Sequence, residues 1–157
     1  MTKEKYIKQS KTEQIQIVMS RHINGNGRLF GGALMQWVDV VAATVARRHS
    51  ETDVTTAFID SLSFKAPAFL NNIVLLKGKL TFVGTTSMEV RVDSYAEYPG
   101  GTKTLVNTAY LVMVAVDEND IPVAVPKLIL STDEEIQEYK RAEKRYSLRK
   151  TRNKENY

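Results

Sequence analysis

The chain has 157 residues, of which 43% are apolar and 25% are charged, so it is expected to form one folded domain and wholesale disorder is excluded. It contains no cysteine, which excludes disulfides, thiolate catalysis and cysteine-based metal sites. The net charge of +4 is uneven, because residues 137–157 hold eight Lys or Arg and three Glu while the rest of the chain is nearly neutral.

The first part of the chain predicts a short strand, a loop and a long helix. Residues 1–10 are polar and are expected to be flexible. Alternating apolar residues predict a strand over 12–19, and the Asn and Gly content predicts a loop over 20–30. From Gly31 to about Arg48 the sequence is apolar nearly all round, which is typical of a buried helix.

The second part of the chain alternates with a period of two, which indicates strands. Tight turns between consecutive strands predict antiparallel pairing. Ser131 as N-cap and Glu134 three residues later predict a helix that runs to about Arg149. One long buried helix with an antiparallel sheet is an α+β arrangement. The predicted strands are 54–64, 73–83, 86–96 and 102–116.

Residues 24–39 are the most informative segment. A polar loop leads into the paired glycines Gly31 and Gly32, and Asp39 lies in the middle of the apolar helix that follows. Glycines let a ligand approach the backbone closely, and the first turn of a helix has free N–H groups that stabilise negative charge. An acid on a buried helix is costly unless it is paired or catalytic. The alternative is that the glycines serve packing and Asp39 is solvated.

Several motifs resemble those of the hotdog-fold acyl-CoA thioesterases. The run Asn24-x-x-Gly27-x-x-Phe30-Gly31-Gly32-x-Leu34-Met35-x-Trp37-x-Asp39 is similar to the family signature, and Val54–Ala57, Ser63–Pro67 and Gly84–Met88 recur in similar places. Residues 69–72 depart from the usual turn of the family.

The resemblance covers residues 11–146 and implies the hotdog fold, a long helix wrapped by a curved antiparallel sheet. Residues 1–10 are then a flexible N-terminus, and residues 147–157 are a basic tail that is expected to be disordered. The sequence shows neither a secretory signal nor a stretch long enough to span a bilayer, so we expect a cytoplasmic protein that does not bind a membrane.

The resemblance also implies an activity, the hydrolysis of acyl-CoA thioesters to a free carboxylic acid and CoA without a cofactor. Asp39 is the candidate general base or nucleophile. Backbone N–H groups near Gly31 and Gly32 are a candidate oxyanion hole. In the family, the asparagine and the acid of one site come from two subunits, which implies that Asn24 of one chain faces Asp39 of its partner and orients water or the thioester. The active unit is then a homodimer, often within a trimer of dimers.

Further residues are candidates for binding the substrate. Basic side chains are expected to meet the phosphates of CoA, and the turn at residues 84–87 can bind its pantetheine arm. The candidates are Arg28, Phe30, Gly31, Lys65, Thr85, Thr86 and Ser87, with Lys144 and Arg145 of the last helix.

Other interpretations of single residues stay open. Asp60 shares a predicted strand face with Thr56, Phe58 and Leu62, so it is a rival catalytic acid or a satisfied buried acid. His22 is expected at the surface and His49 at the helix C-cap. With Asp39 these histidines form no spaced metal motif, so we predict no metal site.

Alternative functions belong to other classes. A hotdog protein of this size can bind or sense acyl-CoA without turnover. Dehydratases of the same fold use a histidine-and-acid motif that this sequence lacks. The basic tail lacks the interleaved aromatic residues of single-strand binders, so no nucleic acid is expected as a partner.

Overall fold

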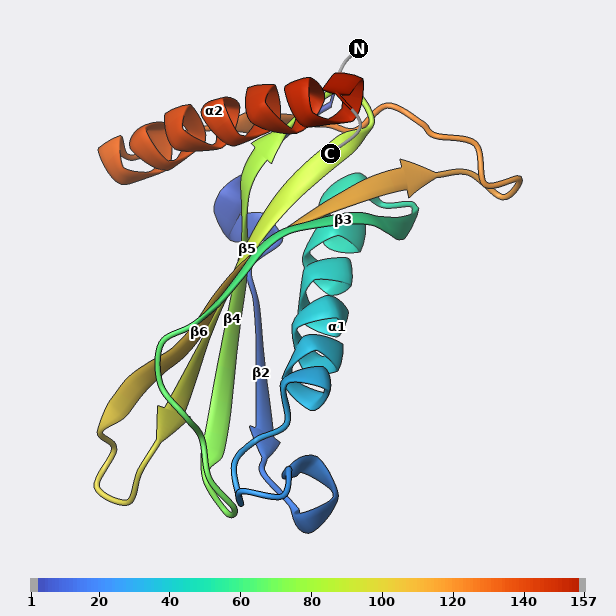
Figure 1. The fold of residues 1–157 in the computed structure, drawn as a ribbon. Coiled ribbons are helices and arrows are strands. Elements are labelled where there is room, and N and C mark those ends of the chain that lie inside the picture. Colours follow the sequence, from blue (N-terminus) through green and yellow to red (C-terminus); the bar gives the residue numbers. More distant parts are fainter. Residues whose placement is uncertain (1–2, 156–157) are drawn as a thin grey trace.

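The structure, a computed structural model, describes residues 3–155. Two short 3-10 helices, η1 (Ile7–Gln9) and η2 (Ser20–His22), accompany the strands and α-helices (Figure 1). These are strands β1 (Glu4–Tyr6), β2 (Thr12–Ile17), β3 (Asp53–Phe64), β4 (Ile73–Val83), β5 (Ser87–Glu97), β6 (Lys103–Val116) and β7 (Lys127–Ile129), and helices α1 (Gly31–Ser50) and α2 (Asp133–Glu155).

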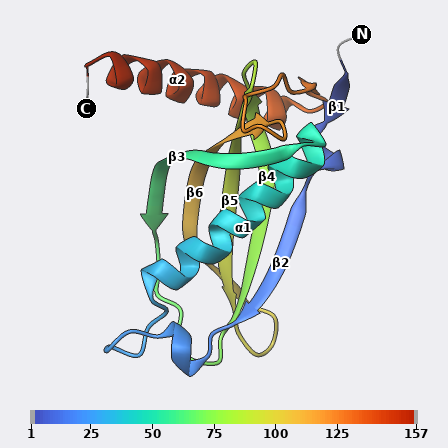
Figure 2. The same ribbon diagram turned by 90° about the vertical axis from the view of Figure 1, so that its right-hand side faces the viewer.

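Within the described residues, an antiparallel sheet of five strands has the order β2-β4-β5-β6-β3 and curves around α1. Although β3 precedes β4 in the chain, it pairs with β6 at the far edge of the sheet. Figure 2 shows α1 crossing one face of this sheet while α2 lies across one end of it. The predicted α+β hotdog fold is therefore confirmed.

The core lies between α1 and the sheet. Leu34, Val38 and Val41 of α1 are buried against apolar side chains of β4, β5 and β6. Gly78 of β4 permits the close approach, because a Cβ atom there would lie 2.7 Å from Val41 Cγ1. No helix within residues 3–155 is both long and apolar enough to cross a membrane.

The prediction that α1 is buried nearly all round is wrong on one side. Met35 is 39% exposed and Val40 is 50% exposed. The sheet covers one face of the helix, and no other described segment covers these two side chains. These exposed apolar side chains are a candidate contact surface for another molecule.

Two irregularities in β3 change the predicted strand face. The register with β6 shifts between Thr56 and Phe58 and again between Ile59 and Ser61. Each shift inserts a residue and reverses the side chains that follow. Thr56 therefore contacts Asp39 of α1, whereas Asp60 contacts α2. The prediction that Thr56 and Asp60 share one face is wrong for this reason.

The ends of the chain are more ordered than the sequence suggested. Residues 4–6 form β1, which pairs with β7, and Lys5 Nζ donates a hydrogen bond to Arg48 O at 2.8 Å. Helix α2 continues to Glu155 instead of ending at about Arg149, and Arg149 is buried by ion pairs. The N-terminal segment, which was expected to be flexible over residues 1–10, is thus structured over 4–10. The C-terminal tail, which was expected to be disordered over residues 147–157, is structured over 147–155. Residues 1–2 and 156–157 lie outside the described range.

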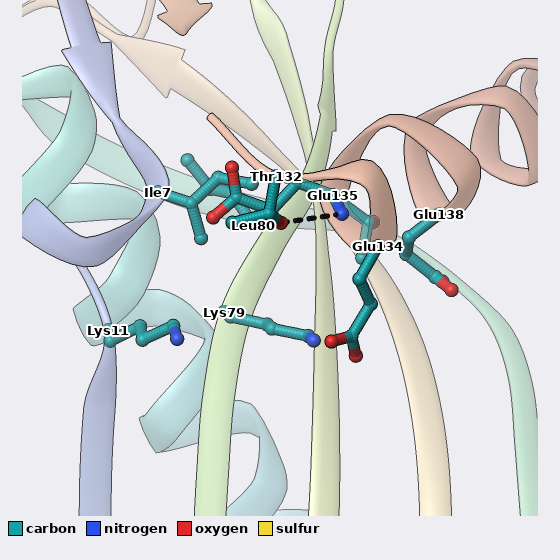
Figure 3. Close-up of a pocket in the computed structure, with 9 residues that line it drawn as sticks. Ile7, Lys11, Lys79, Leu80, Thr132, Glu134, Glu135 and Glu138 are labelled. Atoms are coloured by element: carbon teal, nitrogen blue, oxygen red, sulfur yellow. Dashed lines mark hydrogen bonds between the residues drawn. The ribbon is translucent and has the colours of Figure 1, made fainter. Parts of the chain in front are cut away.

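The N-cap of α2 lies one residue after the predicted one. Glu135 N donates to Thr132 Oγ1 at 3.1 Å (Figure 3). Ser131 N donates to the Glu135 carboxylate at 2.7 Å. Thr132, and not Ser131, is therefore the capping residue, with Glu135 in the place expected for Glu134.

His49 is buried inside the last turn of α1 and is not an exposed C-cap. Its Nε2–H donates to Pro126 O at 2.8 Å, and its Nδ1 has no hydrogen-bond partner within the described residues. Glu51, at φ 60°, ends the helix instead. Burial lowers the pKa of His49 below its ordinary value, and nearby Lys5 lowers it further.

We expect this histidine to make the fold sensitive to acid. The unfolded chain takes up a proton on His49 at about pH 6.5, before the folded chain does, so stability falls as the pH drops through that value. The free energy of unfolding in urea, compared at pH 8 and pH 5.5, should fall more for the wild type than for His49→Gln. Equal losses in both proteins would contradict this assignment.

Candidate active site

The acid predicted from the sequence has a hydroxyl partner. Thr56 Oγ1 on β3 donates a hydrogen bond to Asp39 Oδ1 at 2.7 Å and lies 3.4 Å from Met113 Sδ. Asp39 is half-buried and Thr56 is exposed. Asp39 Oδ2 accepts no hydrogen bond within residues 3–155, so it is free to bind a water or a substrate group. The pair therefore presents an oriented carboxylate at an open surface.

Thr56 is a candidate functional residue that sequence reasoning missed. A threonine in a strand is ordinary, because β-branched residues are favoured there. Its only signal was its place in the motif Val54–Ala57. The side of the strand on which Thr56 lies depends on the bulge that follows it, and alternation in the sequence does not reveal that bulge.

The loop before α1 fixes the orientation of Asn24. Its Oδ1 accepts hydrogen bonds from Asn26 N at 2.9 Å and Arg28 N at 3.3 Å. The turn is completed by Gly27, whose φ of 71° favours glycine. Since the side-chain oxygen is occupied, the Nδ2 group of Asn24 is left to donate to a ligand. This arrangement suits binding of a carbonyl oxygen better than activation of a water.

The start of α1 offers two unused donors. Ala33 N and Leu34 N both donate to Phe30 O, at 3.0 and 3.2 Å. The N–H groups of Gly31 and Gly32 make no backbone hydrogen bond within the described residues, as expected for the first turn of a helix. A Cβ atom on Gly32 would lie 2.5 Å from the ring of Phe30, so this position tolerates only glycine without a shift.

Several predicted residues gather at this end of the molecule. A groove of about 330 Å³ is lined by Asn24, Arg28 and Lys65, with Phe64, Leu34 and Val106 among its apolar residues. The Phe64 ring lies 3.5 Å from the position of a Cβ atom on Gly31. The structure thus brings together the loop, the helix start and two cations, and Phe30 is exposed beside them.

Other predicted residues lie elsewhere. Thr85, Thr86 and Ser87 form the turn between β4 and β5, next to α2 and at the opposite end of the sheet from Asn24 (Figure 1). Arg145 of α2 is bound to Glu89 and Glu138 at 2.8 and 3.2 Å, so its charge is already neutralised. A single chain therefore does not assemble all the candidates in one place.

The rival acid and the histidines have structural partners. Asp60 is 7% exposed and binds Arg149 at 2.9 Å and Arg152 at 2.6 Å, which supports its interpretation as a satisfied buried acid. His22 Nδ1 accepts from Met19 N at 3.0 Å, and its ring packs edge-on against Trp37. Within residues 3–155, no cluster of three or more His, Asp or Glu is placed to bind a metal ion.

A further hollow lies away from these residues. Figure 3 shows it between the N-terminal segment, β4 and the start of α2, lined by Lys11, Lys79 and Glu134 among others. Its charges are mixed and none of its residues is a predicted site residue. It lacks the acid–hydroxyl pair and the free backbone donors described above, so it is not a candidate for catalysis.

Known proteins resemble the chain over most of its length. The family model of the thioesterase superfamily matches residues 26–101. A Bacillus subtilis protein named as an uncharacterized acyl-CoA thioester hydrolase is 37% identical over 149 residues, which are 94% of this chain and 87% of that protein. An apo-hexameric acyl-CoA thioesterase has a TM-score of 0.92 at 36% identity, covering 96% of this chain and 97% of that one.

An acyl-CoA hydrolase from Staphylococcus aureus, solved with butyryl-CoA, CoA and CoA disulfide, has a TM-score of 0.91 at 31% identity. The similarity covers 98% of this chain and 94% of the chain of that enzyme. The same enzyme has been solved with an asparagine, an aspartate or a threonine replaced by alanine. Those three positions have the same order and spacing along its chain as Asn24, Asp39 and Thr56 have here.

Proposed function

The chain belongs to the hotdog-fold thioesterase superfamily and is an acyl-CoA thioester hydrolase, and we propose that Asp39, Thr56 and Asn24 carry out its reaction. The observation that carries the proposal is the 2.7 Å hydrogen bond from Thr56 to Asp39, on a helix that begins with two free glycine N–H groups. The matching positions of the Staphylococcus aureus variants support the choice of these three residues.

Asp39 acts as the general base in this proposal. Thr56 holds Oδ1, and a water at Oδ2 gives its proton to the carboxylate as its oxygen adds to the thioester carbonyl carbon. The carbon–sulfur bond then breaks, and the proton passes to the CoA thiolate. The products are a carboxylic acid and CoA. Direct attack by Asp39 on the carbonyl, with an anhydride intermediate, is the alternative route.

The donors for the carbonyl oxygen come from a second subunit. Asp39 lies seven residues after Gly32 on one helix, a rise of about 10 Å, so the water held by Asp39 and the N–H group of Gly32 are not expected to meet at one carbonyl group within the same chain. Asn24 also makes no hydrogen bond to Asp39 within its own described chain. We infer that Asp39 and Thr56 of one subunit face Gly32 and Asn24 of the partner subunit, and that the homodimer is the active unit.

The surface of the chain supports this assembly. Val40 on α1 and Ile59 on β3 are exposed apolar residues near the acid–hydroxyl pair. Strand β3 pairs only with β6 within the described residues, so its other edge is open to a second copy. One solved relative is hexameric, and a trimer of dimers is the corresponding proposal for this chain.

Loss of the acid should abolish turnover. For Asp39→Asn we expect kcat to fall by about 10²- to 10⁴-fold, the usual contribution of a general base. For Thr56→Val we expect a loss of about 10- to 100-fold, as for a removed hydrogen bond to a charged group. Release of CoA thiol from acetyl- to palmitoyl-CoA measures this without background, because the chain has no cysteine.

Glu118→Gln, an exposed change in the turn after β6, is the matched control and should keep wild-type activity. Wild-type rates in Asp39→Asn would remove Asp39 from the chemistry. Binding of acyl-CoA without turnover of any chain length would instead identify a non-catalytic acyl-CoA-binding protein.

Mixing two inactive variants tests the shared site. In a dimer of Asp39→Ala with Asn24→Ala, one of the two sites has both residues intact. An equal mixture should therefore recover about a quarter of the wild-type activity after the subunits exchange. If native mass spectrometry shows mixed dimers and activity stays at the level of the single variants, the two residues act within one chain.

Gly32 offers a test of the oxyanion donors. Gly32→Ala places a Cβ atom against the Phe30 ring and crowds the first-turn N–H groups of α1, so we expect kcat to fall by about 10- to 100-fold. The melting temperature should change little, because Phe30 is 56% exposed and its ring can move. Gly25→Ala, with no atom within 4 Å of the new Cβ, is the control. Unchanged kcat in Gly32→Ala would show that turnover does not depend on the space that Gly32 leaves beside the Phe30 ring.

A further inference from the structure

His22 lies in the segment before α1 but belongs neither to the acid–hydroxyl pair nor to the oxyanion donors. It is the last residue of η2, in the segment that joins the end of β2 to the start of α1 (Figures 1 and 2). The same segment carries Asn24 and the N-cap residue Phe30. The structure leaves His22 half-buried, and its ring, its N–H group and its carbonyl oxygen all make contacts.

A reciprocal pair of hydrogen bonds joins His22 to the end of β2. Its Nδ1 accepts from Met19 N at 3.0 Å, and its own N–H group donates to Met19 O at 2.8 Å. An imidazole nitrogen accepts a hydrogen bond only where it carries no proton, so the ring proton lies on Nε2 in this contact. The preceding residue, Val18, is bonded through its N–H group to Asn72 O and through its carbonyl oxygen to Asn71 N. The start of the loop is therefore attached to the turn before β4.

The carbonyl group of His22 holds the N-cap of α1. Phe30 N donates to His22 O at 2.7 Å. Phe30 O in turn accepts from Ala33 N and Leu34 N at 3.0 and 3.2 Å. The peptide plane that contains Phe30 O also contains the N–H group of Gly31. The position of His22 therefore determines where the helix presents its first free donor.

The ring of His22 also contacts α1 directly. It packs edge-on against the Trp37 indole, with ring centroids 4.9 Å apart and an interplanar angle of 83°, a preferred geometry of aromatic pairs. Trp37 is 7% exposed and belongs to the core, so it gives the imidazole a fixed surface to pack on. One residue thus connects the end of β2, the N-cap and the body of the helix.

Few other side chains fix the loop. Within residues 19–30, the side-chain atoms that hydrogen-bond to the backbone are His22 Nδ1 and Asn24 Oδ1. Asn24 shapes the outer turn, and backbone contacts with Ala68 and Phe69 hold the returning arm. Residues 24–26 are exposed. A segment with so few buried contacts keeps one position only where its ends are held, and His22 holds the end next to β2.

We propose that His22 is a positioning residue for thioester hydrolysis, whose side chain sets the place of Asn24 relative to the N–H groups of Gly31 and Gly32. The assignment rests on the proposed function of these donors. Donors stabilise a developing oxyanion only when they lie within hydrogen-bond distance of the place that the oxygen takes, and a small displacement slows the reaction. His22 acts through the backbone of the loop and of Phe30.

Three replacements of His22 separate the two contacts of its ring. His22→Ala removes both contacts, His22→Phe keeps a ring for Trp37, and His22→Asn keeps an acceptor for Met19 N. With butyryl-CoA we expect kcat to fall by about 10- to 100-fold in His22→Ala and in His22→Phe, the cost of misplaced donors. In His22→Asn it should stay within about fivefold of the wild type, because the hydrogen bond is restored.

The Michaelis constant distinguishes positioning from a general loss of binding. It should stay within about twofold in all three variants, because the misplaced donors act on the transition state more than on the bound substrate. Arg21→Gln, an exposed change next to His22 in η2, is the matched control and should keep the wild-type kcat.

Backbone amide signals test the position of the donors without turnover. The chain has eight glycines, so labelling with ¹⁵N-glycine gives a simple spectrum in which Gly31 and Gly32 are assigned from their alanine variants. In His22→Ala the signals of these two residues should shift or broaden, and in His22→Asn they should return toward the wild-type positions. Gly78 in β4 and Gly84 at the opposite end of the sheet should keep their signals in both variants.

This spectrum also separates the present proposal from the proposed function. If the wild type hydrolyses no thioester, the proposed function fails, while a shift confined to Gly31 and Gly32 still shows that His22 positions the start of α1. Wild-type kcat in His22→Ala, or signals of Gly31 and Gly32 that do not move, would overturn the assignment. A change that also reached Gly78 and Gly84 would overturn it too, because His22 would then support the fold in general.

Discussion

Two bulges in the pairing of β3 with β6 determine which layer of the molecule each β3 side chain contacts. The first bulge follows Thr56, which donates its hydroxyl to Asp39 on α1. The second accompanies Asp60, which binds Arg149 on α2. A strand with regular alternation would place both side chains on one face. The irregular strand instead contacts the candidate catalytic acid on one side of the sheet and the arginine that holds α2 on the other.

Helix α2 is held against the sheet more by ion pairs than by apolar packing. Ala142 is its buried apolar residue, and Tyr139 and Tyr146 pack on Phe82. Buried ion pairs contribute little net stability because both charges lose water, yet removing one partner is strongly destabilising, by about 3–5 kcal/mol. Such pairs therefore select one position of the helix. Here they keep the Tyr146 ring next to Gly84.

The geometry of α1 makes a two-subunit site the consistent arrangement. Its first turn supplies free donors and its third turn supplies Asp39, so the groups needed at one carbonyl are separated by about 10 Å of helix. A second copy related by two-fold symmetry can bring the helix start of one chain to the acid of the other. The exposed Val40 and the open edge of β3 are the surfaces that such a copy would cover.

The sequence by itself determined the order of helix and strands and the long apolar helix after Gly31 and Gly32, and it predicted Asn24 and Asp39 as site residues. These follow from local signals: glycine and asparagine in a turn, apolar periodicity, and an acid out of place among apolar residues. The family resemblance rested on the same contiguous motif, and the comparisons confirm it.

Only the tertiary structure decided the partners of these residues. Thr56 contacts Asp39 although the even spacing of Thr56 and Asp60 predicted one face for both, because a bulge separates them. Arg149 belongs to the segment predicted as a basic tail, but it is buried because it forms ion pairs with Asp60 and Glu89. Register shifts and ion pairs between residues 60 to 90 positions apart carry no local signature in the chain. They depend on which strands become neighbours, and β3 pairs with β6 rather than with β4, the next strand in the sequence.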